Sequence, residues 1–141
     1  MRVLGVDLGR RRVGLAISDP TGMLARPLAT IAVEAAADAL EKVVGEITRL
    51  GAQEDGLAAV VVGVPSRLDG TSTIETSQAT AFIDALKART SLPVVGEGER
   101  LTSREAESRL AVRERDWRKR KQQLDAAAAA VILQDYLDRQ R

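Results

Sequence analysis

The sequence predicts an α/β protein with a mixed five-stranded sheet flanked by helices. First, three strand-like apolar runs follow one another before any helical pattern begins. Second, helical and strand-like patterns alternate from residue 34 onward. Adjacent antiparallel strands need only a hairpin, whereas parallel strands need a crossover helix, so this order predicts a mixed sheet. Third, the 141 residues contain no internal repeat and no linker, which predicts a single domain over residues 1–141.

The first strand, residues 2–9, carries one carboxylate among apolar and glycine residues. Side chains alternate between the faces of a strand, so its leucines and Val6 share one face and Asp7 lies on the other. Gly5 and Gly9 flank Asp7 on that face and leave room for an ion or a phosphate. The simpler alternative is that Asp7 and Gly9 only open a hairpin, because Asp and Gly are common turn residues.

The remaining elements follow from the spacing of apolar residues and from helix-capping patterns. Further strands are expected at residues 13–18, about 23–31, 57–64, and from 92 into Glu99. Helices are expected at 34–50, from a Ser72 and Glu75 capping box to about residue 90, from a second such pair at Thr102 and Glu105, and from the basic stretch 113–121 to about Arg139.

The sequence contains no cysteine and no histidine. Their absence excludes disulfides, zinc sites built from thiolates or imidazoles, and catalytic Ser-His-Asp or Cys-His groups. A hydrolase of this composition would depend on carboxylates and a hard metal ion. The longest apolar run, Ala126 to Leu133, is far shorter than the ~20 residues that span a bilayer. The N-terminus also lacks a secretion signal, so we expect a cytoplasmic protein that does not contact membranes.

Three acidic residues are candidates for a metal site: Asp7, Glu99 and Asp125. Glu99 ends the last predicted strand, at the sheet edge where ligands bind in open α/β sheets. Asp125 continues the apolar stripe of the last helix, on which the alanines that follow it would allow close packing on the sheet. Glu97 lies two residues before Glu99, so both side chains would lie on the same face of the strand, and Glu97 is an alternative to Glu99. Each acid also has a structural alternative: Glu99 as a solvated charge, and Asp125 as the partner of a nearby Arg or Lys.

Carboxylates brought together in this way would repel one another. Two of them ~5 Å apart repel by roughly 3 kcal/mol at an effective dielectric constant of ~20. A divalent cation removes this repulsion, and oxygen ligands suit Mg²⁺ or Mn²⁺. Two such ions can activate water and stabilise the leaving oxygen of a phosphodiester.

Basic residues stand beside each candidate acid, a distribution that favours binding of a polyanion. With one Trp, one Tyr and one Phe in the chain, base stacking cannot dominate recognition. We therefore expect a structured nucleic acid as the partner, either folded RNA or branched DNA. The candidate substrate-binding residues are Arg10, Arg11, Arg12, Arg100, Arg118, Lys119, Arg120 and Lys121.

Five segments, in order, resemble motifs of the YqgF/RuvX family, whose members are described as Holliday junction resolvases or pre-16S ribosomal RNA nucleases. They are Leu4 to Gly9, Gly14 to Asp19, Val61 to Pro65 with Leu68 to Gly70, Glu99 to Ser103, and Asp125 to Ala128. The resemblance implies a ribonuclease H-like fold, a Mg²⁺ or Mn²⁺ requirement, and a catalytic, metal-binding triad on Asp7, Glu99 and Asp125. The chain departs from the family pattern at Gly98, where an Asp is usual, and at Glu97, where an apolar residue is usual.

The sequence thus predicts a metal-dependent endonuclease that cuts structured RNA, processing the 5′ end of pre-16S rRNA in ribosome biogenesis. The main alternative is a Holliday junction resolvase, which would normally act as a dimer; the sequence favours neither a monomer nor a homodimer. A non-catalytic nucleic-acid-binding module is a second alternative. An ATP-binding protein is a third, because actin-like and sugar-kinase folds also place Asp-x-Gly in a first hairpin, although they use two such domains.

Overall fold

The structure is a computed structural model, which describes the backbone of residues 1–99 and 117–140 and the side chains of residues 1–98 and 124–140. The short helix expected from Thr102 and Glu105 lies outside these residues. The described elements are β1 (Arg2–Leu8), β2 (Arg12–Ser18), β3 (Ala25–Ala32), α1 (Ala36–Gly51), β4 (Leu57–Pro65), α2 (Ile74–Lys87), β5 (Val94–Glu99) and α4 (Trp117–Arg139).

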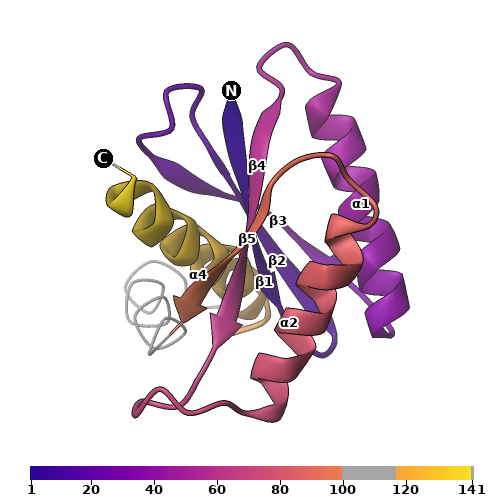
Figure 1. The fold of residues 1–141 in the computed structure, drawn as a ribbon, viewed down its shortest axis with the longest axis vertical. Coiled ribbons are helices and arrows are strands. Elements are labelled where there is room, and N and C mark those ends of the chain that lie inside the picture. The colour runs from indigo at the N-terminus through magenta and orange to yellow at the C-terminus, as the bar shows by residue number, and fades with distance from the viewer. Residues whose placement is uncertain (100–116, 141) are drawn as a thin grey trace.

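The sheet has five strands in the order β3-β2-β1-β4-β5, with β1 in the centre (Figure 1). The first three strands pair antiparallel through hairpins, and β4 pairs parallel with both β1 and β5. Helices α1 and α2 make the crossovers that the parallel pairs require. The expected mixed five-stranded sheet is therefore confirmed.

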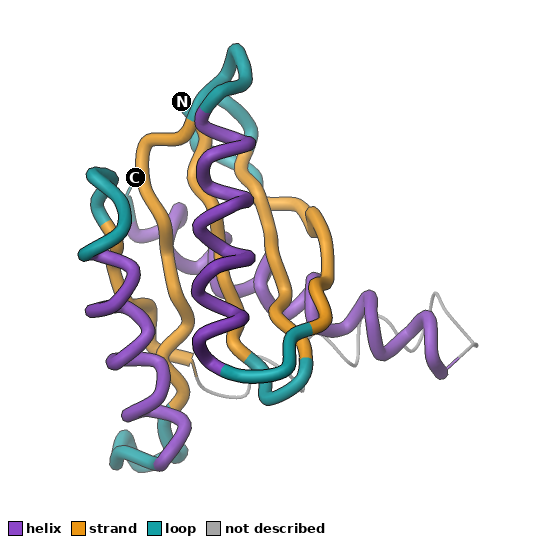
Figure 2. Tube along the Cα trace, turned by 90° about the vertical axis from the view of Figure 1, so that its right-hand side faces the viewer, coloured by secondary structure: helices purple, strands orange, loops and turns teal. Residues whose placement is uncertain are grey.

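The sheet separates two layers of helix. Helices α1 and α2 cover one face, and α4 lies across the other, with its first turns extending past the sheet (Figure 2). Strand alternation sends Leu4 and Val6 into the core beneath α1 and α2, whereas Val3 packs with Ala129 and Leu133 of α4. Asp7 follows Val3 by an even number of residues, so it belongs to the face that α4 covers. No helix among the described residues is long and apolar enough to cross a membrane.

Helix α4 approaches the sheet unusually closely because glycines lie beneath it. A Cβ atom placed on Gly14 would lie 1.9 Å from the carbonyl oxygen of Asp125, and one on Gly5 would lie 2.8 Å from Cβ of Leu133. Both separations are shorter than any side chain tolerates. On the helix, Ala126 and Ala129 are buried at this contact. The glycines on the strands and the alanines on α4 therefore determine how closely the helix packs on the sheet.

This contact also determines which residues meet. The antiparallel register of β1 and β2 pairs Gly14 with Asp7. Because the backbone of Asp125 rests on Gly14, it lies beside the strand position that carries Asp7. Two acids that are distant in sequence therefore come to the same end of the sheet.

The predicted capping box of α2 is wrong by one residue. We expected Ser72 and Glu75, but the N-cap is Thr73, whose Oγ1 accepts a hydrogen bond from the backbone N–H of Thr76 at 3.2 Å. In return, Oγ1 of Thr76 accepts from the backbone N–H of Thr73 at 2.9 Å. A threonine hydroxyl thus takes the part usually played by a glutamate, and the helix begins at Ile74. It also ends earlier than expected, at Lys87.

A Gly14→Ala substitution should destabilise the protein, because the new methyl group would push α4 off the sheet. We expect about 1–3 kcal/mol of lost unfolding free energy, the usual cost of overpacking. Gly45→Ala is the matched control, since Gly45 lies on the exposed side of helix α1 and has open space around it. That change should stabilise the protein by about 0.5–1 kcal/mol. Urea denaturation of the three proteins tests both values, and equal stabilities would contradict the close contact.

Candidate functional site

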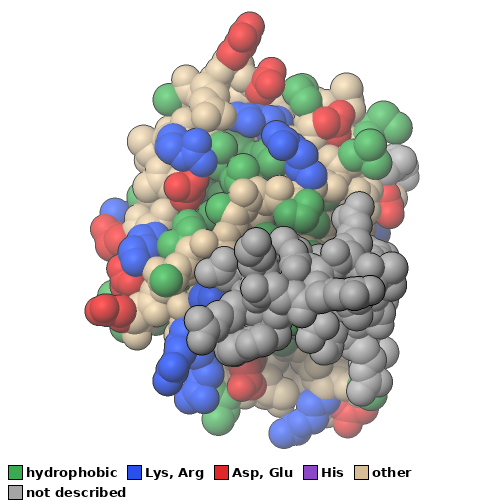
Figure 3. All heavy atoms as spheres, turned by 180° about the vertical axis from the view of Figure 1, so that it is seen from behind, with side chains coloured by type: hydrophobic (Ala, Val, Ile, Leu, Met, Phe, Trp, Pro, Cys, Tyr) green, Lys and Arg blue, Asp and Glu red, His purple; other side chains and the backbone are tan. Residues whose placement is uncertain are grey.

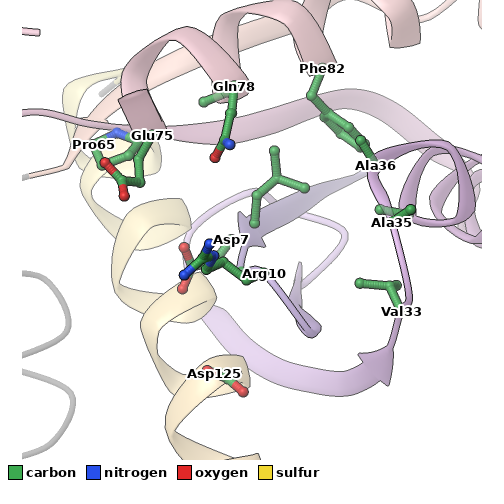
Figure 4. Close-up of a pocket in the computed structure, with 14 residues that line it drawn as sticks. Asp7, Arg10, Val33, Ala35, Ala36, Pro65, Glu75, Gln78, Phe82 and Asp125 are labelled. Carbon is green, nitrogen blue, oxygen red and sulfur yellow. The ribbon is translucent and has the colours of Figure 1, made fainter. Parts of the chain in front are cut away.

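A pocket of about 490 Å³ opens at the end of the sheet where β1 and β4 finish. Parallel strands and the helices that follow them commonly form ligand sites at this edge. Residues from β1, the β1–β2 hairpin, α1, α2 and α4 all contribute to its wall (Figure 4). Those labelled in the figure are Asp7, Arg10, Val33, Ala35, Ala36, Pro65, Glu75, Gln78, Phe82 and Asp125.

Two of the three predicted catalytic acids line this pocket. Asp7 comes from the end of β1. Asp125 comes from α4, at the point where the helix backbone rests on Gly14. Both side chains are half-buried, so they are accessible to a ligand yet partly shielded from water. The structure therefore brings Asp7 and Asp125 together in one cavity, as candidates for the same function.

Asp125 also has a protein partner. The Nε atom of Arg12 donates a hydrogen bond to Oδ2 of Asp125 at 2.7 Å, so the structural alternative considered for Asp125 is present. The two side chains are 31% and 29% exposed. Ion pairs open to solvent usually contribute only about 0–1 kcal/mol. Such a pair holds the carboxylate in place but leaves it open to displacement by a more highly charged cation.

The β1–β2 hairpin contains three consecutive arginines, of which Arg10 lines the pocket. The backbone N–H of Gly9 donates to the carbonyl of Arg12 at 2.9 Å, and a Cβ on Gly9 would lie 2.5 Å from that oxygen. The turn is therefore too tight for a side chain at Gly9. Arg10 lines the pocket, Arg12 pairs with Asp125, and Arg11 accepts a hydrogen bond from the N–H of Val33 through its carbonyl, at 2.8 Å.

The remaining predicted site residues are described only in part or not at all. Glu99 is the last residue of β5, where the strand register places it opposite Pro65, a residue of the pocket wall. Its side chain and the whole of Arg100 lie outside the described residues. The backbones of Arg118, Lys119, Arg120 and Lys121 belong to the first turns of α4, and their side chains also lie outside. Within the described part of the chain, no three carboxylates form a metal-binding cluster.

Glu97, the alternative to Glu99, has a different environment. Its side chain is 4% exposed and forms an ion pair with Arg139, the last residue of α4. The pair is made by Oε2 of Glu97, an atom that is itself buried. Burial raises the pKa of the Glu97 carboxyl, the charge of Asp135 raises it further, and Arg139 opposes the shift. Glu97 therefore joins β5 to the end of α4 and does not line the pocket.

Several pocket residues were missed by the sequence analysis. Glu75 and Gln78 extend from the first two turns of α2, and Val33 precedes α1. The available signal was that a helix after a parallel strand begins at the ligand-binding edge of the sheet. Asp69, in the loop between β4 and α2, has the role of a turn residue, because its Oδ1 accepts a hydrogen bond from the backbone N–H of Thr71 at 2.9 Å.

Positive and negative side chains are mixed on the rear face of the molecule. Figure 3 shows Lys and Arg side chains close to Asp and Glu side chains in several places on this face. The mixture agrees with the net charge of +1 for the whole chain. A ligand in the pocket would therefore interact mainly with the cations beside it. Among the described side chains these include Arg10, which lines the pocket, and Arg12, which pairs with Asp125.

Comparison with known proteins identifies relatives over the whole chain. Residues 1–139 match the family model described as "RuvX: Holliday junction resolvase". A protein of Anaeromyxobacter sp. strain K, named "Putative pre-16S rRNA nuclease", is 42% identical over 99% of this chain and 98% of its own length. A protein of Chloroflexus aggregans with the same name is also 42% identical, over 99% of this chain and 94% of its own.

Solved structures with the same architecture include a viral resolvase and a RuvC protein. The fowlpox virus resolvase in complex with Holliday junction DNA aligns with a TM-score of 0.58 at 15% identity, over 99% of both chains. Thermus thermophilus RuvC aligns with a TM-score of 0.54 at 17% identity, over 99% of this chain and 96% of its own. At these identities the similarity concerns the fold, and the expected ribonuclease H-like fold is confirmed.

The pKa of Glu97 predicts a pH-dependent effect on stability. A carboxyl whose pKa is raised by folding destabilises the folded protein when it ionises, so its cost grows as pH rises from about 4.5 through the folded pKa. Glu97→Gln should therefore melt at a higher temperature than the native protein at pH 8, and the difference should vanish toward pH 4. Arg139→Gln should show the opposite change at pH 8, because it removes the opposing cation. A Glu97→Gln variant less stable than the native protein at pH 8 would contradict this account.

Proposed function

Because the chain belongs to the RuvX family, we propose that it is a metal-dependent endonuclease that hydrolyses phosphodiester bonds in structured RNA. The observation that carries the proposal is the pocket in which Asp7 and Asp125 lie together with Arg10 at its rim. Hydrolysis of a phosphodiester needs a place for the phosphate, an activated water and stabilisation of the charge that develops. Paired acids with adjacent cations provide the residue types for each of these.

The residues present suit a divalent metal ion. Carboxylate oxygens are hard donors of the kind that Mg²⁺ and Mn²⁺ prefer. Asp7 and Asp125 would hold the ion, with Glu99 as the third ligand that the family motif implies. When bound, such ions lower the pKa of water and neutralise charge on the phosphate. The partly exposed pair with Arg12 is compatible with this, because Asp125 can exchange one cationic partner for another.

The chain's own residues would position the substrate. Arg10 stands at the pocket rim, where its guanidinium can hold a phosphate oxygen of the backbone. Arg12 can do the same once it leaves Asp125, so one side chain would alternate between the acid and the phosphate. The first turns of α1 and α2 also line the pocket, and the positive ends of their dipoles favour negative charge there.

For the substrate, we propose pre-16S rRNA, processed at its 5′ end in the cytoplasm. Two relatives at 42% identity carry a name for that activity over nearly their full length. Cleavage of four-way DNA junctions is the second candidate, because the matched family model is described as a Holliday junction resolvase. The same acids and arginines would serve either reaction, so the distinction lies in which nucleic acid reaches the pocket.

Cleavage assays should show metal-dependent cutting that Asp7→Asn abolishes. We expect a loss on the order of 100-fold or more. The asparagine amide is neutral, so it cannot bind the cation as a carboxylate does, and it cannot act as a base. The assay compares a folded pre-16S rRNA fragment with a four-way DNA junction, in Mn²⁺ and in chelator. Asp84→Asn is the matched control, since Asp84 is exposed on α2 and does not line the pocket. Cutting of the RNA alone would support rRNA processing, and full activity in Asp7→Asn would refute the site.

Metal binding should also be visible without any substrate. An ion that binds only the folded protein stabilises it by about 2.7 kcal/mol at 100 times its dissociation constant. Mg²⁺ or Mn²⁺ should therefore raise the melting temperature of the native protein and of Asp84→Asn. The rise should be much smaller in Asp7→Asn and in Asp125→Asn. An equal rise in all four proteins would place the ion elsewhere.

A further inference from the structure

We propose that the pocket beside Asp7 and Asp125 has a second compartment, which accepts an unpaired nucleobase of the substrate strand next to the phosphate that is cut. The inference rests on the proposed nuclease function and adds the conformation that the substrate must adopt. It comes from the composition of the pocket wall, which changes from charged to apolar across one continuous cavity.

One end of the cavity is polar and the other is apolar. Asp7, Arg10 and Asp125 lie toward α4, whereas Val33, Ala36 and Phe82 lie on the other side, at the start of α1 and along α2 (Figure 4). The cavity volume of about 490 Å³ is within the range of small-molecule sites and exceeds what a phosphate group alone would fill. A nucleotide has the same two-part character, with an anionic phosphate joined to a flat base whose two faces are apolar and whose edges carry hydrogen-bonding groups.

The apolar compartment exists because small residues form its helical walls. Ala36 and Ala39 of α1 face the cavity, as does Ala79 of α2. Leucine or isoleucine at these positions would extend side chains into the space, as the larger core residues further along both helices do. Ala36 is exposed, so the cavity is accessible from solvent at this point.

A polar side chain at the boundary suits a base more than an aliphatic ligand. Gln78 extends from α2 toward the cavity in Figure 4 and is exposed to solvent. Its amide offers both hydrogen-bond donors and an acceptor, the combination found on base edges. A base within a duplex is stacked and paired, so only an unpaired or extruded base could enter.

The test uses two variants in adjacent positions of the first turn of α1. Ala36→Leu would fill the apolar compartment, whereas Ala37→Leu places the same side chain on an exposed residue that does not line the cavity. The substrate is a pre-16S rRNA fragment in which 2-aminopurine replaces each unpaired base in turn. Its fluorescence rises when the base leaves a stack, and the signal is read in chelator and in Mg²⁺. Binding is thus followed even if no bond is cut.

We expect a fluorescence rise at one position with the native protein and with Ala37→Leu, and its loss with Ala36→Leu. Cutting by Ala36→Leu should fall about tenfold or more, the usual effect of misfit in an apolar pocket. Replacing the same nucleotide by an abasic one should make Ala36→Leu and Ala37→Leu cut equally. The same fluorescence change in all three proteins, or none at any position, would overturn the inference. The expected fluorescence pattern without cutting would support the base compartment and refute the nuclease function.

Discussion

The contact between Gly14 and the backbone of Asp125 is the constraint on which the site depends. A helix that covers a sheet normally stands off by the depth of two layers of side chains. Here one layer is missing, because Gly14 on the strand leaves room for the helix backbone itself. The register of the β1–β2 hairpin then fixes Asp125 beside Asp7. The position of the acids is thus a consequence of backbone packing and requires no contact between the two carboxylates.

The same packing explains how the protein can hold acids together before any cation binds. Arg12, from the hairpin that Gly9 tightens, pairs with Asp125 and supplies a positive charge beside it. Because both side chains remain partly open to solvent, water screens this pair and limits its contribution to stability. Glu97 shows the contrasting arrangement, since it is buried, pairs with Arg139 and lies outside the pocket. The two acids therefore differ in solvent access: Asp125 is open to a ligand in the pocket, whereas the buried Glu97 links β5 to α4.

Much of this could be predicted from sequence because it rests on local periodicity. Strand alternation separated Asp7 from the core-facing Leu4 and Val6, and helical spacing placed Asp125 on the buried stripe of α4. The sequence predicted an Arg or Lys as a possible partner of Asp125 but could not identify Arg12, since the pair joins residues 113 positions apart and depends on how closely α4 packs on the sheet. The apolar half of the pocket was missed for a similar reason: a cavity is the space that neighbouring helices leave between them, and no single segment encodes it.

The central claim is that Asp7 and Asp125 form one cation site. Anomalous diffraction from crystals containing Mn²⁺ would test it most directly, because the scattering locates the ion without reference to activity. We expect a Mn²⁺ peak in the pocket with carboxylate oxygens of both residues as ligands, and the Arg12 guanidinium displaced from Asp125. An intact Arg12–Asp125 pair with no peak at the pocket, or a peak confined to another part of the surface, would contradict the claim.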